Sequence, residues 1–500
     1  MATYTSLGAY SGTLMIPEFK GLNQYGDHIG TNPCYAVEAR NALTKSGVLR
    51  PMAANEMLPL ATDSPIETLA LLHRRWHTTD AMADVLIAAA GGQLYWSLPI
   101  GSAWNKIELP EGFVGNRYLD DNWSWVAYEI NPEDDAAEAP IDVLLMSNAK
   151  DGMICIRGDD MTASIVPTPK KFGVITRHAE RIWGASIEDD PDMLVYSAPY
   201  DPFNWAQNDE IPEDGAGDIM QPSWDGDSFQ ALTTFGSQLL AFKKSRVWRV
   251  IGTNPGEYVF KEQFGGGTSY PATIAVSGSR VLMLGDEGIL QYNGEQVAPY
   301  YQEYAADVFA RINRAAISKA YACIYNNTYY CALPLDESQD NNAVLMYDTV
   351  ERTWLLREDV EVEAFLPTLD RLYYTSASTP GYVWLWHEDS WEENRSAEPM
   401  RWVTPWVDFG RKDIAKSGFT VYLNVECRQA TKLKLSMETE KKLKTKEIIF
   451  APPADEQHSK QRRVVFGGNG RRFRLIIESE QEYPWRMVGG LQVEVETDVD

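Results

Sequence analysis

The sequence lacks the signatures that identify many enzymes, metalloproteins and membrane proteins. Its five cysteines are a sparse, odd set without a CxxC pair, which indicates free thiols in a reducing compartment. No apolar run approaches the roughly 20 residues of a membrane-spanning helix, and no basic segment followed by an apolar one stands at the N-terminus. The motifs GxSxG, GxxxxGKS/T and HExxH are also absent. We therefore expect no membrane segment and no catalytic centre of these types.

Positive charge is scarce as well. The chain has 45 Lys and Arg against 71 Asp and Glu, a formal net charge of −26, and a surface of this sign repels nucleic acid. Residues 182–227 contain twelve carboxylates and no Lys or Arg, whereas residues 411–474 contain 16 basic and 7 acidic residues. Opposite patches allow a chain to bind copies of itself or partners with the complementary pattern. Solvated faces of a soluble protein are the alternative.

Aromatic residues and turn-forming clusters are abundant. The 16 Trp and 25 Tyr favour pleated, half-buried strands. The stretch Phe172–Trp205 shows the recurring pattern, because the strand RIWGAS, the turn EDDPD and the strand MLVYSA predict a β-hairpin. Similar hairpins are predicted between residues 83 and 387 at VLIAAA–QLYWSL, IDVLLMS–MICIRG, LLAF–VWRVIG, VLML–ILQY, ACIY–TYYCAL, VLMYD–TWLL and RLYYTS–YVWLW.

This repetition predicts a mostly β protein whose main domain is a β-propeller. A chain of 500 residues exceeds a single core, so two or three domains are expected. The hairpin spacing fits blades of about 40–50 residues, hence about six or seven blades with degenerate repeats. Alternating strands after residue 400 predict a C-terminal β-sandwich. The expected domains are an N-terminal arm with a short helix (1–80), the propeller (81–390) and the sandwich (400–500).

Two short helices are expected. Ser64, Pro65 and Glu67 form a capping pattern that predicts a helix running to about Trp76. Between residues 301 and 312, apolar side chains recur at helical spacing, which predicts an inserted amphipathic helix that packs on the propeller.

We predict no catalytic, cofactor-binding or metal-binding residue and no cofactor. His73 and His77 stand four residues apart, but a zinc site needs further ligands. Glycines 265–267 lack the lysine of a phosphate-binding loop and indicate a connection between blades. The carboxylate runs 133–135 and 188–190 lack the alternation of a calcium loop, so solvated turns explain them better.

A group of arginines near the C-terminus is the best candidate for contact with nucleic acid. Two phenylalanines, Phe466 and Phe473, are interleaved with this group, which could bind phosphates. A solvated sheet face or a subunit contact is the alternative. The group consists of Arg462, Arg463, Arg471, Arg472 and Arg474.

Several segments together resemble the tail hub, nozzle or DNA-stabilising propeller proteins of short-tailed bacteriophages. Phe19, Gly21, Leu22 and Asn23, followed by AVEARNALTKSGVLRP, are similar to the opening of such proteins. The resemblance covers most of the chain in order. It continues through HAERIWGAS, DPDMLVYSAPYDPFNW, LLAFKKSRVWRVIG, VLMLGDEGILQYNG, RWVTPWVDFGRKDIAKSGFTVYLN and Gly470–Phe473.

The resemblance implies a structural role and no enzymatic activity. In that family, a ring of six copies lies below the portal and its adaptor, extends the DNA channel and helps to retain and deliver the genome. The implied partners are further copies of the chain, the head-to-tail adaptor, tail fibre, spike or plug proteins, and duplex DNA that passes without tight binding. The implied location is the virion tail, assembled in the host cytoplasm. Some nozzle proteins are longer, so this chain resembles a compact version.

The charge distribution suits such a conduit. Residues 400–500 carry 18 basic and 15 acidic residues, or +3, which leaves −29 for residues 1–399. Acidic walls repel phosphates and let a duplex slide, while the more basic C-terminal domain could contact acidic faces of neighbours. The alternative is a propeller protein that binds or cleaves glycans, which would require carboxylates with a tyrosine at one end of the channel. A cellular propeller scaffold is a third hypothesis.

Overall fold

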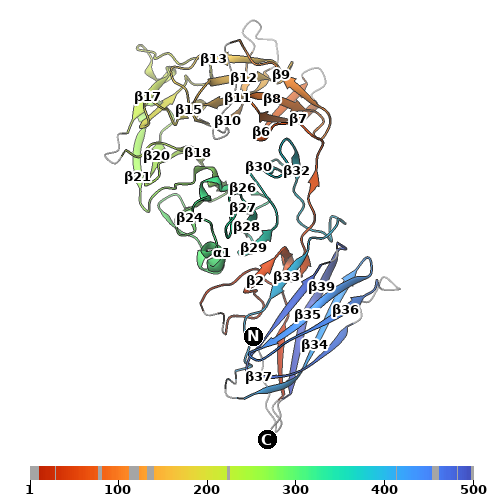
Figure 1. Ribbon diagram of the computed structural model, residues 1–500. Helices are drawn as coiled ribbons and strands as arrows, with labels where there is room; N and C mark the ends of the chain where they lie inside the picture. The colour runs from red at the N-terminus through yellow and green to blue at the C-terminus, as the bar shows by residue number, and fades with distance from the viewer. Residues whose placement is uncertain are drawn as a thin grey trace.

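The protein consists of a ring of β-sheets and an elongated β-sandwich on one side of it (Figure 1). The computed structural model describes residues 11–26, 28, 30–76, 81–111, 123–131, 140–221, 226–410, 412, 414–452, 461–480 and 482–496. No helix in these segments is long and apolar enough to cross a membrane.

In the described residues, the ring contains seven antiparallel sheets of four strands each, so it is a seven-bladed β-propeller. Blade one consists of β6 (Ile66–Trp76), β7 (Ala81–Ala90), β8 (Gln93–Ser97) and β9 (Trp104–Ile107), and blade two consists of β10 (Ser124–Ile130), β11 (Ile141–Asn148), β12 (Gly152–Arg157) and β13 (Ala163–Val166). Blade three consists of β14 (Val174–His178), β15 (Arg181–Ala185), β16 (Met193–Tyr196) and β17 (Gly217–Met220), and blade four consists of β18 (Ala231–Phe235), β19 (Gln238–Phe242), β20 (Val247–Ile251) and β21 (Val259–Gln263).

Blades five to seven follow the same order. Blade five consists of β22 (Ala275–Ser277), β23 (Arg280–Leu284), β24 (Ile289–Tyr292) and β25 (Val297–Pro299), and blade six consists of β26 (Tyr321–Tyr325), β27 (Thr328–Leu333), β28 (Ala343–Asp348) and β29 (Thr353–Glu358). Blade seven consists of β30 (Ala364–Pro367), β31 (Leu372–Thr375), β32 (Val383–Leu385) and β5 (Glu56–Met57). The first strands of most neighbouring blades contact each other, so they lie on the inner side of the ring.

The cores of the propeller lie between blades because each blade packs against two neighbours. Strand β11 shows the consequence, since the side chains of residues 143–146 are all 0% exposed. Leu144 and Met146 join a cluster with blade one, whereas Val143 and Leu145 join a cluster with blade three. Alternating side chains thus pack on opposite faces of the strand, and because both faces are buried, the strand has a continuous apolar sequence.

The ring is closed by a strand from the N-terminal region. β5 pairs with β32, where Trp384 is opposite Met57. Arg357, only 2% exposed, donates hydrogen bonds to the Ala53 carbonyl at 2.7 Å and the His387 carbonyl at 2.8 Å. The last blade therefore combines β5, which precedes all other blade strands in the sequence, with β30, β31 and β32, which follow them. The edge of β32 is covered by β5.

The sandwich also contains strands from the N-terminal region. Its two sheets have the strand orders β1-β39-β34-β37 and β2-β33-β38-β35-β36. The strands are β1 (Ser11–Ile16), β2 (Glu38–Arg40), β33 (Met400–Val403), β34 (Lys416–Cys427), β35 (Thr431–Thr439), β36 (Leu443–Phe450), β37 (Arg462–Gly470), β38 (Phe473–Ser479) and β39 (Trp485–Glu496). The N-terminal arm is thus an integral part of both domains, with Phe19 edge-on to Trp402 at 5.0 Å.

The predicted helix between Ser64 and Trp76 is wrong, because these residues include β6. Leu69 and Leu71 pack into the cluster shared with blade seven, whereas Ala70 and Leu72 pack toward blade two. Burial on two opposite faces requires a period of two. Tertiary packing therefore overrides the local capping pattern.

The predicted amphipathic helix at residues 301–312 is present but shorter. It consists of the 3-10 turn η5 (Gln302–Ala305) and the helix α1 (Ala306–Ala310), and Val308 and Phe309 face the core as expected. The remaining short elements are β3 (Ala42–Leu43), β4 (Arg50–Pro51) and the 3-10 turns η1 (Lys45–Gly47), η2 (Pro212–Asp214), η3 (Pro255–Glu257), η4 (Pro271–Thr273) and η6 (Ile317–Lys319).

Candidate functional site

The carboxylate turn between β15 and β16 links three blades. The Nζ atoms of Lys170 and Lys243 lie 2.6 Å and 2.5 Å from carboxylate oxygens of Asp190 and Asp192. Lys243 belongs to blade four and is 1% exposed. In the run at 188–190, Glu188 and Asp189 are exposed, as expected of a solvated turn, whereas Asp190 and the nearby Asp192 hold neighbouring blades together. The turn therefore has a structural role.

The loop between β16 and β17 is held in place by a buried arginine. Arg181 is 1% exposed, and its guanidinium donates hydrogen bonds to the carbonyls of Ser197 at 2.7 Å, Gly215 at 2.6 Å and Glu213. It also lies over the Tyr196 ring at 5.3 Å. Three carbonyls from both ends of one loop therefore converge on one cation, which fixes the loop.

This loop presents acidic side chains to solvent. We define the acidic loop as the exposed residues Asp209, Glu210, Glu213, Asp214 and Asp218. No ion pair of these carboxylates occurs within the described part of the chain. Unlike the turn at 188–192, the acidic loop keeps its negative charge uncompensated.

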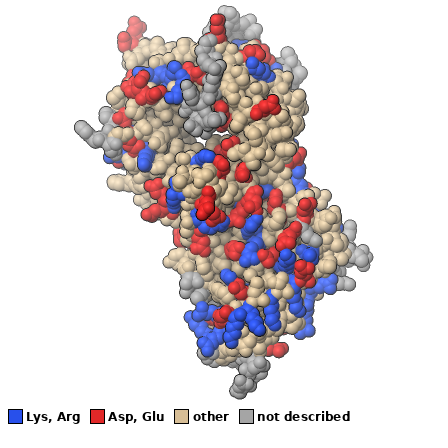
Figure 2. Space-filling view, viewed as in Figure 1, with Lys and Arg blue, Asp and Glu red and all other residues tan. Residues whose placement is uncertain are grey.

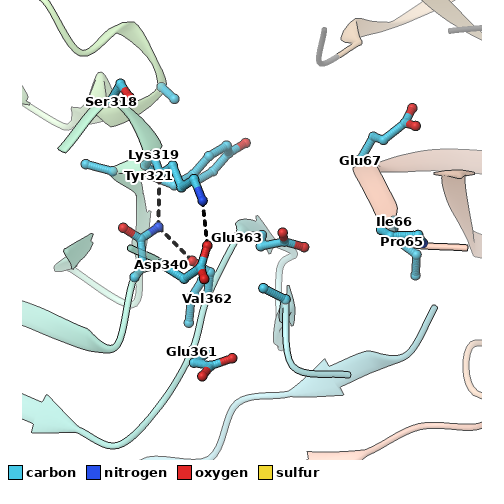
Figure 3. A pocket seen from close by; sticks show the side chains of 14 residues that line it. Pro65, Ile66, Glu67, Ser318, Lys319, Tyr321, Asp340, Glu361, Val362 and Glu363 are labelled. Carbon is cyan, nitrogen blue, oxygen red and sulfur yellow. Dashed lines mark hydrogen bonds and ion pairs between the residues drawn. The ribbon is translucent and has the colours of Figure 1, made fainter. Parts of the chain in front are cut away.

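A second acidic group lines a cavity of about 710 Å³ at the inner strands of blades six, seven and one (Figure 3). Glu361 and Glu363 precede β30, and Glu67 lies across the cavity from them. Asp340 also lines the cavity and pairs with Lys319 at 2.6 Å. Tyr321 lines the same cavity as these carboxylates.

Burial raises the pKa of two carboxyl groups of this cavity, those of Glu67 and Glu363. Burial raises the pKa of Glu67 to about 7, although a hydrogen bond from the Gly91 backbone acts in the opposite direction. Desolvation also raises the pKa of Glu363, and the Asp340 carboxylate adds to this effect. Burial therefore disfavours the ionised forms of Glu67 and Glu363.

The substitution Glu67→Gln is expected to stabilise the protein at pH 8. The folded state holds a proton on Glu67 up to about pH 7, whereas the unfolded state loses it near 4.5, so stability falls as pH rises between these values. Because the side chain is only partly buried, we expect a gain of about 1–2 kcal/mol at pH 8 and almost none at pH 4. Urea unfolding at both pH values tests this, and an equal effect at both would contradict it.

A further cavity, of about 690 Å³, lies where the last blade meets the segment that leads to the sandwich. Its walls include the buried ring of Trp386, the contact of His387 with the Glu393 carboxylate and the ion pair of Arg395 with Glu56. Glu56 belongs to the closing strand β5, so the pair with Arg395 ties both ends of the propeller together.

Basic side chains gather at the free edge of the sandwich, at its lower end in Figure 2. We define the basic edge as Lys442, Lys444 and Lys446 at β36 and Arg463 and Arg471 at β37, all exposed. β36 and β37 are the outermost strands of the two sheets in the described chain. No ion pair of the five occurs within that part of the chain.

The structure divides the predicted arginine cluster. Arg474 does not belong to the basic edge, because it binds Glu438 at 2.7 Å and lies over the Trp406 ring at 4.8 Å. Phe466 and Phe473 are each 1% exposed, so neither ring can stack on a nucleotide base. The lysines of β36 were not singled out from the sequence, although their spacing of two in KKLKTK is the signal that could have identified them.

The remaining candidate residues have structural surroundings. His73 Nδ1 lies 2.7 Å from Asp84, while His77 and the run 133–135 lie outside the described residues. Gly267 approaches the Lys243 carbonyl so closely that a Cβ atom would lie 1.9 Å from that oxygen. The loop connects blades four and five as predicted.

No metal-binding cluster of three His, Cys, Asp or Glu occurs in the described ranges. All five cysteines are buried and free, as predicted.

The fold defines the protein as a seven-bladed β-propeller joined to a β-sandwich. No protein-family model and no curated protein matches the sequence. Solved structures with similarity include YCF48 from Cyanidioschyzon merolae, at 8% identity over 67% of this chain and 99% of that chain, with a TM-score of 0.29. The Pan2 WD40 domain from Neurospora crassa shares 9% identity over 70% and 88%, with a TM-score of 0.28. BBS1N, in its complex with ARL6DN, shares 8% over 66% and 95%, with a TM-score of 0.37. These similarities carry no argument about function.

Proposed function

We propose that this protein is a structural component of a bacteriophage virion, namely a subunit of an oligomeric tail hub or nozzle. In this role, a ring of copies below the portal and its adaptor extends the DNA channel and helps to retain and deliver the genome. Its partners are further copies of the chain, the adaptor and fibre, spike or plug proteins.

The observation that carries this proposal is the ordered sequence resemblance, which runs from Phe19 to Phe473. The resembling segments fall on different parts of the molecule. HAERIWGAS covers β15, and the segment from Arg401 to Asn424 covers β33 and most of β34. The same segments supply structural residues, such as Arg181 beneath the acidic loop. The resemblance therefore concerns the scaffold itself, as suits a structural protein.

The charge of the propeller supports the passage of DNA without tight binding. Residues 1–399 carry −29, and the acidic loop is uncompensated within the described chain. Such surfaces repel phosphate groups and keep a duplex mobile. The proposal assigns no catalytic step to any residue.

The mass of the purified full chain in solution tests the proposed assembly. One copy has a mass of 56.3 kDa, so native mass spectrometry over a range of concentrations should find an oligomer whose mass is a fixed whole multiple of this value. A chain that is monomeric at every concentration would contradict the proposed ring.

The second candidate is a tail protein that binds or cleaves glycans, favoured by the cavity that contains Glu67, Glu361, Glu363 and Tyr321. A raised pKa suits a general acid, and a second, ionised carboxylate could act as nucleophile or base. Turnover of host polysaccharides by the wild type, lost in Glu67→Gln and Glu361→Gln, would support this function. Absence of both turnover and binding would reject it.

A further inference from the structure

We propose that the acidic loop of one copy binds the basic edge of another copy, in a head-to-tail contact. The inference rests on the proposed ring and assigns two surfaces to its assembly. The acidic loop leads into β17 of blade three, whereas the basic edge runs along β36 and β37 in the sandwich (Figure 1). The two surfaces cannot meet within one copy.

The acidic loop is fixed before any partner binds. Besides the three bonds from Arg181, the Asn208 side-chain oxygen accepts hydrogen bonds from the backbone N–H groups of Glu210 at 3.1 Å and Ile211 at 3.0 Å. The Ala216 N–H donates to the Ala206 carbonyl at 2.9 Å. A loop that is already ordered loses little conformational entropy on binding. Ile211, 51% exposed, adds an apolar side chain among the carboxylates.

The basic edge has the complementary composition. Lys446 Nζ lies 5.7 Å from the centre of the Phe466 ring, and Lys444 reaches across to β37 beside Gly467. Their aliphatic stems cover the end of the sandwich core and leave the charged groups in solvent. Ile449 on β36 and Val465 on β37 are 66% and 43% exposed. Exposed apolar side chains therefore accompany the charged groups on both surfaces.

The charges also determine the geometry of the contact. A two-fold symmetric contact centred on the basic edge would place it against itself, which like charges disfavour. Lysines at a free sheet edge act against such edge-to-edge pairing. Opposite charge is present on the acidic loop, so the favoured contact joins different surfaces of the two copies. Contacts of this type generate rings or open chains.

Two charge-reversal variants of the full chain test the proposal. The edge variant carries Lys442→Glu and Arg463→Glu, and the loop variant carries Glu210→Lys and Asp214→Lys. Each should weaken self-association by about 10- to 100-fold, measured by sedimentation velocity at low ionic strength. The control, Lys45→Glu with Arg352→Glu, makes the same charge change as the edge variant at exposed residues of neither surface and should associate like the wild type. Melting temperatures confirm that all variants fold.

Mixing the two variants gives the most specific readout. The edge variant keeps its acidic loop and the loop variant keeps its basic edge, so an equimolar mixture should form a dimer of one copy of each and nothing larger.

Several results would overturn the proposal. The first is association of both variants at wild-type strength, which would mean that the proposed hub assembles through other contacts. The second is a mixture that stays monomeric. The third is unchanged association of the edge variant together with lost binding of a short DNA duplex, which would make the basic edge a nucleic-acid surface. A monomeric wild type would overturn this contact and the proposed ring together.

Discussion

A chain that lacks residues 1–58 is expected to lose its stable fold. This segment supplies β1 and β2 to the two sheets of the sandwich and β5 to the last blade. It also buries Leu14, Phe19 and Leu22, each 1% exposed. Removing several large buried side chains costs about 10 kcal/mol or more, which is as large as the net stability of a typical domain.

Circular dichroism and soluble yield measure this effect. The truncated chain should aggregate or lose its cooperative unfolding transition. Co-expression of residues 11–58 as a separate chain should restore the transition, whereas a shuffled segment of the same composition should not. A truncated chain that unfolds cooperatively at the wild-type temperature would show that the N-terminal strands are dispensable.

The substitution Arg181→Ala is expected to have the second-largest effect. It leaves the carbonyls of Ser197, Glu213 and Gly215 without their donor, and each buried unsatisfied acceptor costs about 1 kcal/mol or more. We expect a loss of about 3–4 kcal/mol of unfolding free energy and rapid proteolysis within residues 197–216.

The matched control for this prediction is Arg177→Ala on the neighbouring strand. Arg177 is exposed and forms an ion pair with Glu180, and such surface pairs contribute at most about 1 kcal/mol. Urea unfolding compares the two variants. Equal effects would show that the buried guanidinium does not hold the loop.

The hairpins could be predicted from the sequence because their information is local. The glycines at 91 and 92 have φ values of 57° and 75°, as a tight turn between β7 and β8 requires. The turn at Asn326 and Asn327 sets the register that places Cys323 opposite Tyr330. All the predicted hairpins are present in the blades.

The closing strands could not be predicted because they are short and pair with distant segments. β5 has two residues, and its partner β32 follows more than 300 residues later. Local sequence contains no signal for such pairing. For the same reason, the apolar inner strand β6 was mistaken for a helix, since its two buried faces are defined by blades seven and two.

The charged surfaces could be predicted only as regions of the chain. The acidic stretch after Ile182 contains both the turn at 188–192 and the acidic loop, which are adjacent in sequence and differ in role. Lys170 and Lys243, which neutralise the turn, come from other parts of the chain. Arg474 is distinguished from the arginines of the basic edge by its partners Glu438 and Trp406, which come from other strands or loops.

The location of the protein in intact phage particles tests the central claim most directly. Mass spectrometry of purified virions, combined with a low-resolution particle image after labelling of the chain, measures both presence and position. The account predicts several copies per particle, arranged as a ring in the tail below the portal. Absence of the chain from purified particles, together with a strictly monomeric state in solution, would contradict it.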